Sequence, residues 1–343
     1  MIDNRAYGIM LLTKVREQYP KILRFIMSEN ITMIDKINDI ANFCFTKPLN
    51  LSSLKNAILK PAEFLDKNKI KIFISKMDKL PTIPRLYVEL KEVLRTNDYS
   101  LKDIAIIIEK DVNMTAKILQ IVNSAYFSLK YRIYDILHAV IYLGVEAIKS
   151  LVLTLNIFHE FSSDEMRLFN INDLYSHSLA VSCLVSSIVQ SSVTEDKMAE
   201  ESSVSGMLHD IGKLVFIKNK QDIYKNIFEE YNTTGTPIYL LEKQNFGVTH
   251  ADIGGFLAEE WEFSANLVES ITSHHNPDIA LANGLNTNAA VYLANIIDHN
   301  PDSLEIFDES GKIMQIIKKS NQTDDLLLWC SLANKLKNIS LDT

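Results

Sequence analysis

The stretch from Gly206 to Val215 places polar side chains inside an apolar helical pattern. Its apolar residues recur at helical spacing and occupy most of the circumference of a helix. Lys213 follows His209 by four positions and Asp210 by three, so the three side chains can share the remaining face. A buried imidazole and carboxylate need a hydrogen bond, an ion pair or a metal ion, because an unpaired buried charge is costly. The stretch therefore indicates either a structural His–Asp contact or part of a divalent-metal site.

The composition of the 343-residue chain favours a mainly helical protein. Ten glycines and eight prolines are too few for the many tight turns of an all-β protein, and 47% of the residues are hydrophobic, enough for a sizeable core. The net charge of −8 argues against nucleic acid as a partner. The sequence predicts a cytoplasmic protein without a membrane span. Its three cysteines are widely spaced, and it has no apolar run of about 18–20 residues and no signal-peptide core.

Residues 1–66 differ from the rest because short β-prone runs alternate with helical patterns. We predict strands in Ile22–Ser28 and Phe43–Thr46, a helix over Thr32–Asn42 between them, and a further helix capped by Asn50. This alternation is typical of a parallel α/β sheet. The segment resembles the second half of a response-regulator receiver domain. The matching residues are Gly8–Leu12 for the third helix, Tyr19-Pro20 for the loop after it, Ser28 for the switch hydroxyl and Lys47-Pro48 for the phosphate-contacting lysine with its proline.

The receiver-like segment departs from that family at the phosphorylation site. The resemblance would place the phospho-acceptor aspartate and the acidic metal pocket upstream of Met1. We therefore interpret residues 1–66 as a remnant that is not phosphorylated in the usual way, or as a small α/β appendage that packs on the main body. Because exposed strand edges pair with other chains, we expect this edge either to pack on the body or to pair in a homodimer.

The remaining chain has helical patterns almost throughout. Asp66–Lys79 lacks glycine and proline and predicts a helical linker, whereas two prolines in Leu80–Pro84 fix an extended entry. Amphipathic segments separated by cap residues follow from Arg85 onward. Four motifs here resemble the HDOD family, the HD-related output domains of bacterial signalling proteins, over about Met77 to Asp298. They are Leu80–Pro84, Asp111–Leu119, Val122–Phe127 and Ala139–Gly144, and helix capping or closure would also explain each of them structurally.

The resemblance implies a fold class and a domain organisation. We expect a mainly α, HD-superfamily domain in two helical lobes, preceded by the small α/β receiver-like remnant. The expected parts are a receiver-like segment (1–66), a helical linker (67–79), an N-terminal helical lobe (80–170), an HD-like helical core (171–300) and a C-terminal helical extension (301–343).

The HD-like core contains the candidate site. Likeness to catalytic HD-superfamily phosphohydrolases implies a ligand set for one divalent ion, and likeness to the multi-metal HD-GYP relatives implies further ligands and a phosphate-contacting lysine. The first set is His177, His209, Asp210 and Asp298; the further ligands are Asp173 (where glutamate is more usual), His250, His274 and His275; the lysine is Lys213. The structural alternatives are a helix cap for His250, turn chemistry for His274-His275 and an ordinary helix position for Asp298.

Two functions follow from this resemblance. The one we favour is a signalling output module that binds a partner protein or a nucleotide-type ligand without catalysis. The alternative is a metal-dependent phosphohydrolase of a nucleotide or cyclic dinucleotide, with Asp210 and Lys213 as catalytic residues and iron, manganese, zinc or magnesium as the ion. Asn276-Pro277 follows His275, so the Gly-Tyr-Pro signature of cyclic-dinucleotide hydrolysis is absent. A scaffold with a vestigial site is the third interpretation.

Overall fold

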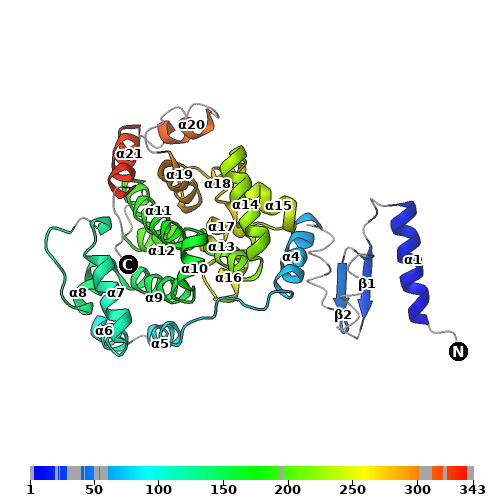
Figure 1. Ribbon diagram of the computed structural model, residues 1–343, viewed down its shortest axis with the longest axis horizontal. Coiled ribbons are helices and arrows are strands. Elements are labelled where there is room, and N and C mark those ends of the chain that lie inside the picture. The colour runs from blue at the N-terminus through cyan, green and yellow to red at the C-terminus, as the bar shows by residue number, and fades with distance from the viewer. Residues whose placement is uncertain are drawn as a thin grey trace. The chain divides into compact units, whose positions relative to one another are not determined.

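The computed structural model divides the chain into two compact units, Met1–Lys76 and Met77–Thr343 (Figure 1). It describes residues 4–19, 22, 24–28, 40–41, 43–49, 54, 61–96, 98–127, 129–192, 196–300, 311–319 and 323–337. Within these residues helices predominate and the strands form a single two-stranded sheet, as the composition predicts.

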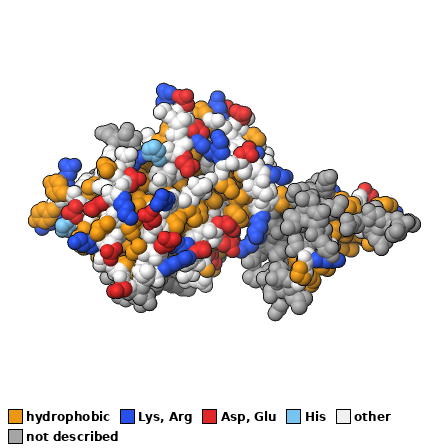
Figure 2. Space-filling model, turned by 90° about the horizontal axis from the view of Figure 1, so that it is seen from below, with side chains coloured by type: hydrophobic (Ala, Val, Ile, Leu, Met, Phe, Trp, Pro, Cys, Tyr) orange, Lys and Arg blue, Asp and Glu red, His pale blue; other side chains and the backbone are white. Residues whose placement is uncertain are grey.

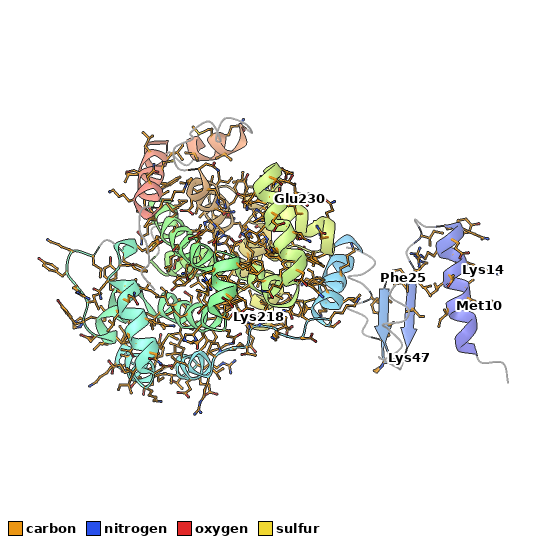
Figure 3. All side chains as sticks on the ribbon, viewed as in Figure 1. Met10, Lys14, Phe25, Lys47, Lys218 and Glu230 are labelled. Atoms are coloured by element: carbon orange, nitrogen blue, oxygen red, sulfur yellow. The ribbon has the colours of Figure 1, made fainter. Side chains whose placement is uncertain are left out.

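The N-terminal unit contains α1 (Asn4–Gln18), β1 (Phe25–Ser28), β2 (Phe43–Thr46) and α4 (Pro61–Ile74). The strands pair in parallel with Phe25 opposite Phe43, so both predicted strands are present. Phe25, labelled in Figure 3, stacks on buried Phe45 with ring centroids 6.1 Å apart, and Leu49 and Leu54 complete this small apolar cluster. The helix predicted over Thr32–Asn42 and the Asn50 cap lie outside the described residues, apart from Ile40 and Ala41.

The second unit begins with short helices that pack on one another. They are α5 (Arg85–Leu94), α6 (Leu101–Glu109), α7 (Val112–Val122), the 3-10 turn η2 (Ala125–Phe127), α8 (Ile136–Leu143) and α9 (Val145–His159). Ser100, Asp111 and Asp135 accept backbone N–H bonds at the starts of α6, α7 and α8, which explains where these helices begin. Asn123 holds the loop before α8, since its Oδ1 accepts from Ile133 N–H at 2.8 Å and its Nδ2 donates to Ile133 O at 2.7 Å.

The rest of the second unit, from residue 163 onward, is a helical bundle around the long helix α11. Its elements are α10 (Ser163–Leu168), α11 (Ile171–Ser192), α12 (Asp196–Leu208), α13 (Ile211–Asn219), α14 (Gln221–Thr234), α15 (Ile238–Phe246), α16 (His250–Glu260), α17 (Ala265–Ser273), α18 (Pro277–Ala280), α19 (Thr287–His299), α20 (Lys312–Lys319) and α21 (Thr323–Lys337). Helix α11 packs on α12, α19 and α21, while α16 packs between α13 and α17. The site residues lie on four of these neighbouring elements.

The stretch from Gly206 to Val215 is not the single helix that its periodicity predicts. Helix α12 ends at Leu208, His209 and Asp210 form a turn, and α13 begins at Ile211. After the turn, α13 approaches α16 so closely that only glycine fits at position 212. A Cβ there would lie 2.1 Å from the backbone oxygen of His250. Asp210 therefore occupies the N-cap of α13, where the partial positive charge of the helix N-terminus favours a carboxylate.

No single helix in the described part of the chain is long and apolar enough to cross a membrane. Helices α8 and α9 pass that test only when taken together, and they meet at a bend of 115°.

Candidate metal centre

Five histidines from four elements converge on Asp210, which gives a cluster of six side chains. The first two, His209 and Asp210 itself, come from the turn between α12 and α13, His177 from α11, His250 from the first position of α16, and His274 and His275 from the end of α17. Asp210 is only 2% exposed, and His209, His250 and His274 are also buried. The sequence separates these residues by up to 98 positions, and the packing of α11, α13, α16 and α17 brings them together.

The carboxylate of Asp210 divides the site into two groups. The first group is His177 Nε2, His209 Nε2 and Asp210 Oδ2, in which the imidazole nitrogens lie 3.7 and 3.4 Å from the oxygen. The second group is Asp210 Oδ1 with His250, His274 and His275; Oδ1 lies 3.1 Å from His250 Nε2 and 3.7 Å from His274 Nε2. Because one carboxylate presents one oxygen to each group, it can bridge two cations.

Each of four imidazoles is fixed through its Nδ1. His209 donates to Gly206 O at 2.7 Å and His274 to Ile271 O at 2.6 Å, both to carbonyls three residues earlier. His177 Nδ1 lies 2.6 Å from Asp298 Oδ2, and His250 Nδ1 lies 2.6 Å from Glu242 Oε2. These oxygens accept a hydrogen bond from Nδ1–H, so in the neutral rings Nε2 carries the lone pair. Histidine ligands of metal ions are oriented by such hydrogen bonds.

The Nε2 atoms crowd together in a way that a cation would relieve. His177 Nε2 is 3.2 Å from His209 Nε2, and His250 Nε2 is 3.2 Å from His274 Nε2 and 2.9 Å from His275 Nε2. Lone pairs at these separations repel one another unless a proton or a metal ion lies between them. All the donor atoms within each group lie within 4.8 Å of one another. Imidazole and carboxylate donors in this arrangement fit a divalent transition-metal ion.

The protonation equilibria of the cluster agree with a cation site. Burial lowers the pKa of His209 and lowers that of His274 well below its usual range, which favours the neutral form of each ring, the form that can ligate. Burial alone would raise the pKa of Asp210, but His209 and Lys213 outweigh it and hold that pKa well below normal. Burial also opposes a charge on His250, but Glu242 outweighs burial and raises its pKa. Metal binding should therefore displace a proton from this cluster.

Lys213 completes the charge balance from α13. Its Nζ donates to Asp210 Oδ2 at 2.6 Å, and its side chain is 12% exposed. Asp210 caps α13 and Lys213 lies in its first turn, so the two side chains share a face as their i,i+3 spacing predicts. The ammonium group thus lies beside the first group of donors, where it can neutralise an anionic ligand that reaches the cluster.

Two of the residues implied by the family resemblance lie outside both groups. Asp298, on α19, holds His177 through Oδ2, and its Oδ1 is buried and accepts no hydrogen bond from the described residues. The expectation that Asp298 shares a common centre with His177, His209 and Asp210 stays a prediction, since Oδ2 is bonded to His177 while Oδ1 has no hydrogen bond from the described residues. Asp173 is exposed in the first turn of α11 and is absent from both donor groups found among the described residues.

The structural alternatives for the histidines are met by other residues. Thr249 caps α16 through a capping box with Asp252, which leaves the side chain of His250 available. Asn276 caps α18 by accepting from Asp278 N–H at 3.1 Å, so His274 and His275 are not needed for that turn. Both caps therefore favour a ligand role for the histidines.

Three residues around the cluster were not identified from the sequence as parts of the site. Glu242, on α15, is fully buried and contacts His250. Tyr239 stacks on His275 with ring centroids 4.3 Å apart, and His299 stacks on His177 at 4.6 Å. The sequence offers one weak signal for His299, which directly follows Asp298, whereas Glu242 and Tyr239 lie in an ordinary amphipathic pattern.

Replacing Asp173 by asparagine should leave the metal content of the purified protein unchanged. The side chain lies on the exposed surface of α11 and outside both donor groups, so loss of its charge should change cation affinity less than about two-fold, within the range of a screened surface charge. Metal-to-protein ratios of the variant and the wild type, measured by elemental analysis after equilibration with manganese, provide the test. A clear fall in the ratio would place Asp173 among the ligands.

Comparison with known proteins agrees with the fold just described. The model of the HDOD domain family matches residues 80–277. An uncharacterized protein of Treponema pallidum (strain Nichols) is 25% identical over 202 residues, which are 59% of this chain and 38% of that protein. The chain thus spans about two fifths of the length of this curated relative.

Solved structures show the same fold. An HDOD domain protein of unknown function from Geobacter sulfurreducens has a TM-score of 0.59 and 20% identity, over 79% of this chain and 98% of its own. A Shewanella amazonensis SB2B protein, named as a candidate metal-dependent phosphohydrolase, has a TM-score of 0.55 and 19% identity, over 83% of this chain and 100% of its own.

The extent of these matches decides which expectations are supported. The family match begins at residue 80, so it gives no support to the receiver-like interpretation of residues 1–66. It covers more than half of the chain and includes every histidine of the cluster. The chain belongs to the HDOD domain family.

Proposed function

We propose that the chain is an HDOD signalling output module whose Asp210-centred cluster binds two divalent cations. The observation that carries the proposal is the pair of donor groups on opposite oxygens of one buried carboxylate. A cation in each group would replace lone-pair repulsion by ligation: the first would link α11 to the turn before α13, and the second would link that turn to α16 and α17. Occupancy of the cluster would thereby control how firmly these helices are held, which gives the module a state that partners can detect.

The donor set narrows the choice of metal. Five imidazoles and one carboxylate favour iron, zinc or manganese, whereas magnesium prefers oxygen donors and retained waters. Of the four ions expected from the family resemblance, magnesium is therefore the weakest candidate.

The output surface we propose lies on the loop before α8. Tyr131 and Tyr134 are 76% and 79% exposed, and Lys130 and Arg132 lie over their rings. Figure 2 shows hydrophobic side chains beside basic ones at the left-hand end, where Figure 1 places α8 and the loop before it. Exposed tyrosine and arginine side chains are enriched where proteins bind other proteins. A signalling protein is the partner class that this surface favours.

A second function, metal-dependent phosphohydrolysis, is favoured by Lys213. Its ammonium group lies 2.6 Å from Asp210 Oδ2 and could pair with a phosphate oxygen at the edge of the cluster. Divalent ions at such a site polarise a phosphoryl oxygen and lower the pKa of a bound water. Asp298 and Glu242 would hold the histidines in one tautomer during turnover. The name of the Shewanella amazonensis relative is consistent with this second function.

Adding manganese, iron(II) or zinc to the metal-free protein should raise its thermal midpoint. A ligand at a hundred times its Kd stabilises the folded state by about 2.7 kcal/mol, and domains of about 150–250 residues gain roughly 2–4 °C per kcal/mol, so several degrees are expected. Differential scanning fluorimetry with and without a chelator measures the change. A midpoint that is the same in both conditions, with no metal retained on dialysis, would leave the scaffold interpretation.

Purified protein loaded with manganese or iron should not hydrolyse cyclic di-GMP appreciably. The physical reason is that Asn276 and Pro277 begin α18 directly after His275, where the residues usually associated with recognition of that nucleotide are missing. Chromatographic separation of the linear product tests this expectation. Turnover that disappears in a His209→Ala variant would show that the expectation is wrong and would favour the second function.

A further inference from the structure

We infer that Glu242 is a positioning residue that fixes His250 as a ligand of the cation in the second donor group. This inference rests on the proposed binding of two cations and adds a residue outside both donor groups. Glu242 lies on α15, eight positions before His250, and is fully buried. A carboxylate in such a place is costly unless its oxygens are satisfied, so its contacts show what it does.

Both oxygens of Glu242 have donors, and two of the three donors belong to His250. Oε2 accepts from the backbone N–H of His250 at 2.7 Å and from its Nδ1 at 2.6 Å. Oε1 accepts from the hydroxyl of Tyr224, on α14, at 2.6 Å. Among the described residues Glu242 forms no ion pair with a lysine or arginine; its ion-pair partner is His250. The negative charge of Glu242 therefore acts directly on this imidazole.

The position of His250 in the chain explains why a side chain is needed for this task. His209 and His274 directly follow α12 and α17, and each donates from Nδ1 to a carbonyl oxygen three residues earlier in that helix. His250 is the first residue of α16, so no turn of its own helix precedes it. Glu242 supplies the missing acceptor, and the turn closed by Gly247 N–H on Lys243 O at 3.0 Å fixes α15 against the start of α16.

The consequence concerns the second donor group alone. In the neutral ring, with the proton held on Nδ1, His250 presents the Nε2 lone pair to the space that it shares with Asp210 Oδ1, His274 and His275. The added negative charge makes this imidazole a stronger donor. His177, in the first group, is oriented by Asp298 in the same way, so each group has its own carboxylate that fixes one histidine.

Glu242→Gln is the variant that tests this role while preserving the shape of the side chain. Its amide oxygen can accept from both donors of His250, and its amide nitrogen can face the Tyr224 hydroxyl, so the fold should be kept while the charge is lost. We expect binding of one cation to weaken by about 10–100-fold, the usual loss on removing a ligand's hydrogen-bonding partner, while the other step stays within about two-fold. Isothermal titration with manganese into metal-free protein resolves the two steps.

Two matched variants separate positioning from a general effect on the fold. Glu230→Gln removes a carboxylate from the exposed surface of α14, at the position labelled in Figure 3, and should change neither step. Tyr224→Phe keeps both contacts of Glu242 with His250 and should lower the thermal midpoint without selectively weakening one step. Two unchanged steps in Glu242→Gln, or equal weakening of both, would overturn the inference. Failure of the wild type to bind manganese would instead overturn the proposed function.

Discussion

Replacing Asp210 by asparagine should abolish both cation-binding steps, whereas replacing His274 by glutamine should abolish one. Asp210 is the residue common to the two donor groups, and His274 belongs only to the second. Asparagine keeps the shape of the side chain but removes the charge that attracts both cations. The loss in each step should exceed the ~10–100-fold that follows removal of a ligand's hydrogen-bonding partner, because here the ligand itself is changed.

Metal titration and elemental analysis of Asp210→Asn, His274→Gln and the wild type measure the difference. Asp222→Asn is the matched control, since that carboxylate is exposed on α14. The asparagine variant should also lose the rise in thermal midpoint that metal gives to the wild type. If Asp210→Asn lost one step and kept the other, the two donor groups would not share this carboxylate as a bridge, and a site for one cation would remain.

The fold of the second unit could be predicted well because its signals are local. Helix starts at Ser100, Asp111 and Asp135 depend on a side chain that caps its own first turn, and such caps are visible in the sequence. The histidine and aspartate residues of the candidate site could be proposed from the order of motifs, because the family resemblance assigns each motif to an element. Convergence of His177 on His209 could not be derived from the spacing alone, since it depends on how α11 packs on α12.

The remaining features could not be predicted because they depend on contacts between helices. The apolar periodicity of Gly206–Val215 is helical on both sides of Asp210, so it conceals the turn that the close approach of α13 to α16 requires. Glu242 has the sequence context of a surface glutamate, and only packing shows that it is buried against His250. Asp173 is one helical turn before His177, yet the orientation of α11 leaves it exposed. Helical spacing defines which residues share a face but not what that face contacts.

Gly212→Ala should destabilise the protein strongly, and more than Gly254→Ala or Gly8→Ala. A Cβ at position 212 would lie 2.1 Å from His250 O, 2.8 Å from His250 C and 2.9 Å from Gly254 N. These are backbone atoms of α16, so no side chain can rotate to make room and the two helices must separate. Overpacking usually costs about 1–3 kcal/mol, and a clash with backbone atoms of two residues should reach at least the upper end of that range.

The same separation should weaken cation binding at the cluster. Gly212 lies between Asp210 and Lys213 at the start of α13 and packs against the backbone of His250, so moving the helices apart would also move these side chains apart. Gly254→Ala is the graded comparison: its Cβ would meet Ile271 Cγ2 at 3.0 Å, a side-chain atom that can shift, so about 1 kcal/mol is expected. Gly8→Ala, with nothing within 4 Å, should be neutral or stabilising by up to ~1 kcal/mol. Urea denaturation followed by circular dichroism ranks the three variants. A Gly212→Ala protein within about 1 kcal/mol of the wild type, with unchanged metal content, would show that α13 and α16 do not pack as closely as the structure indicates.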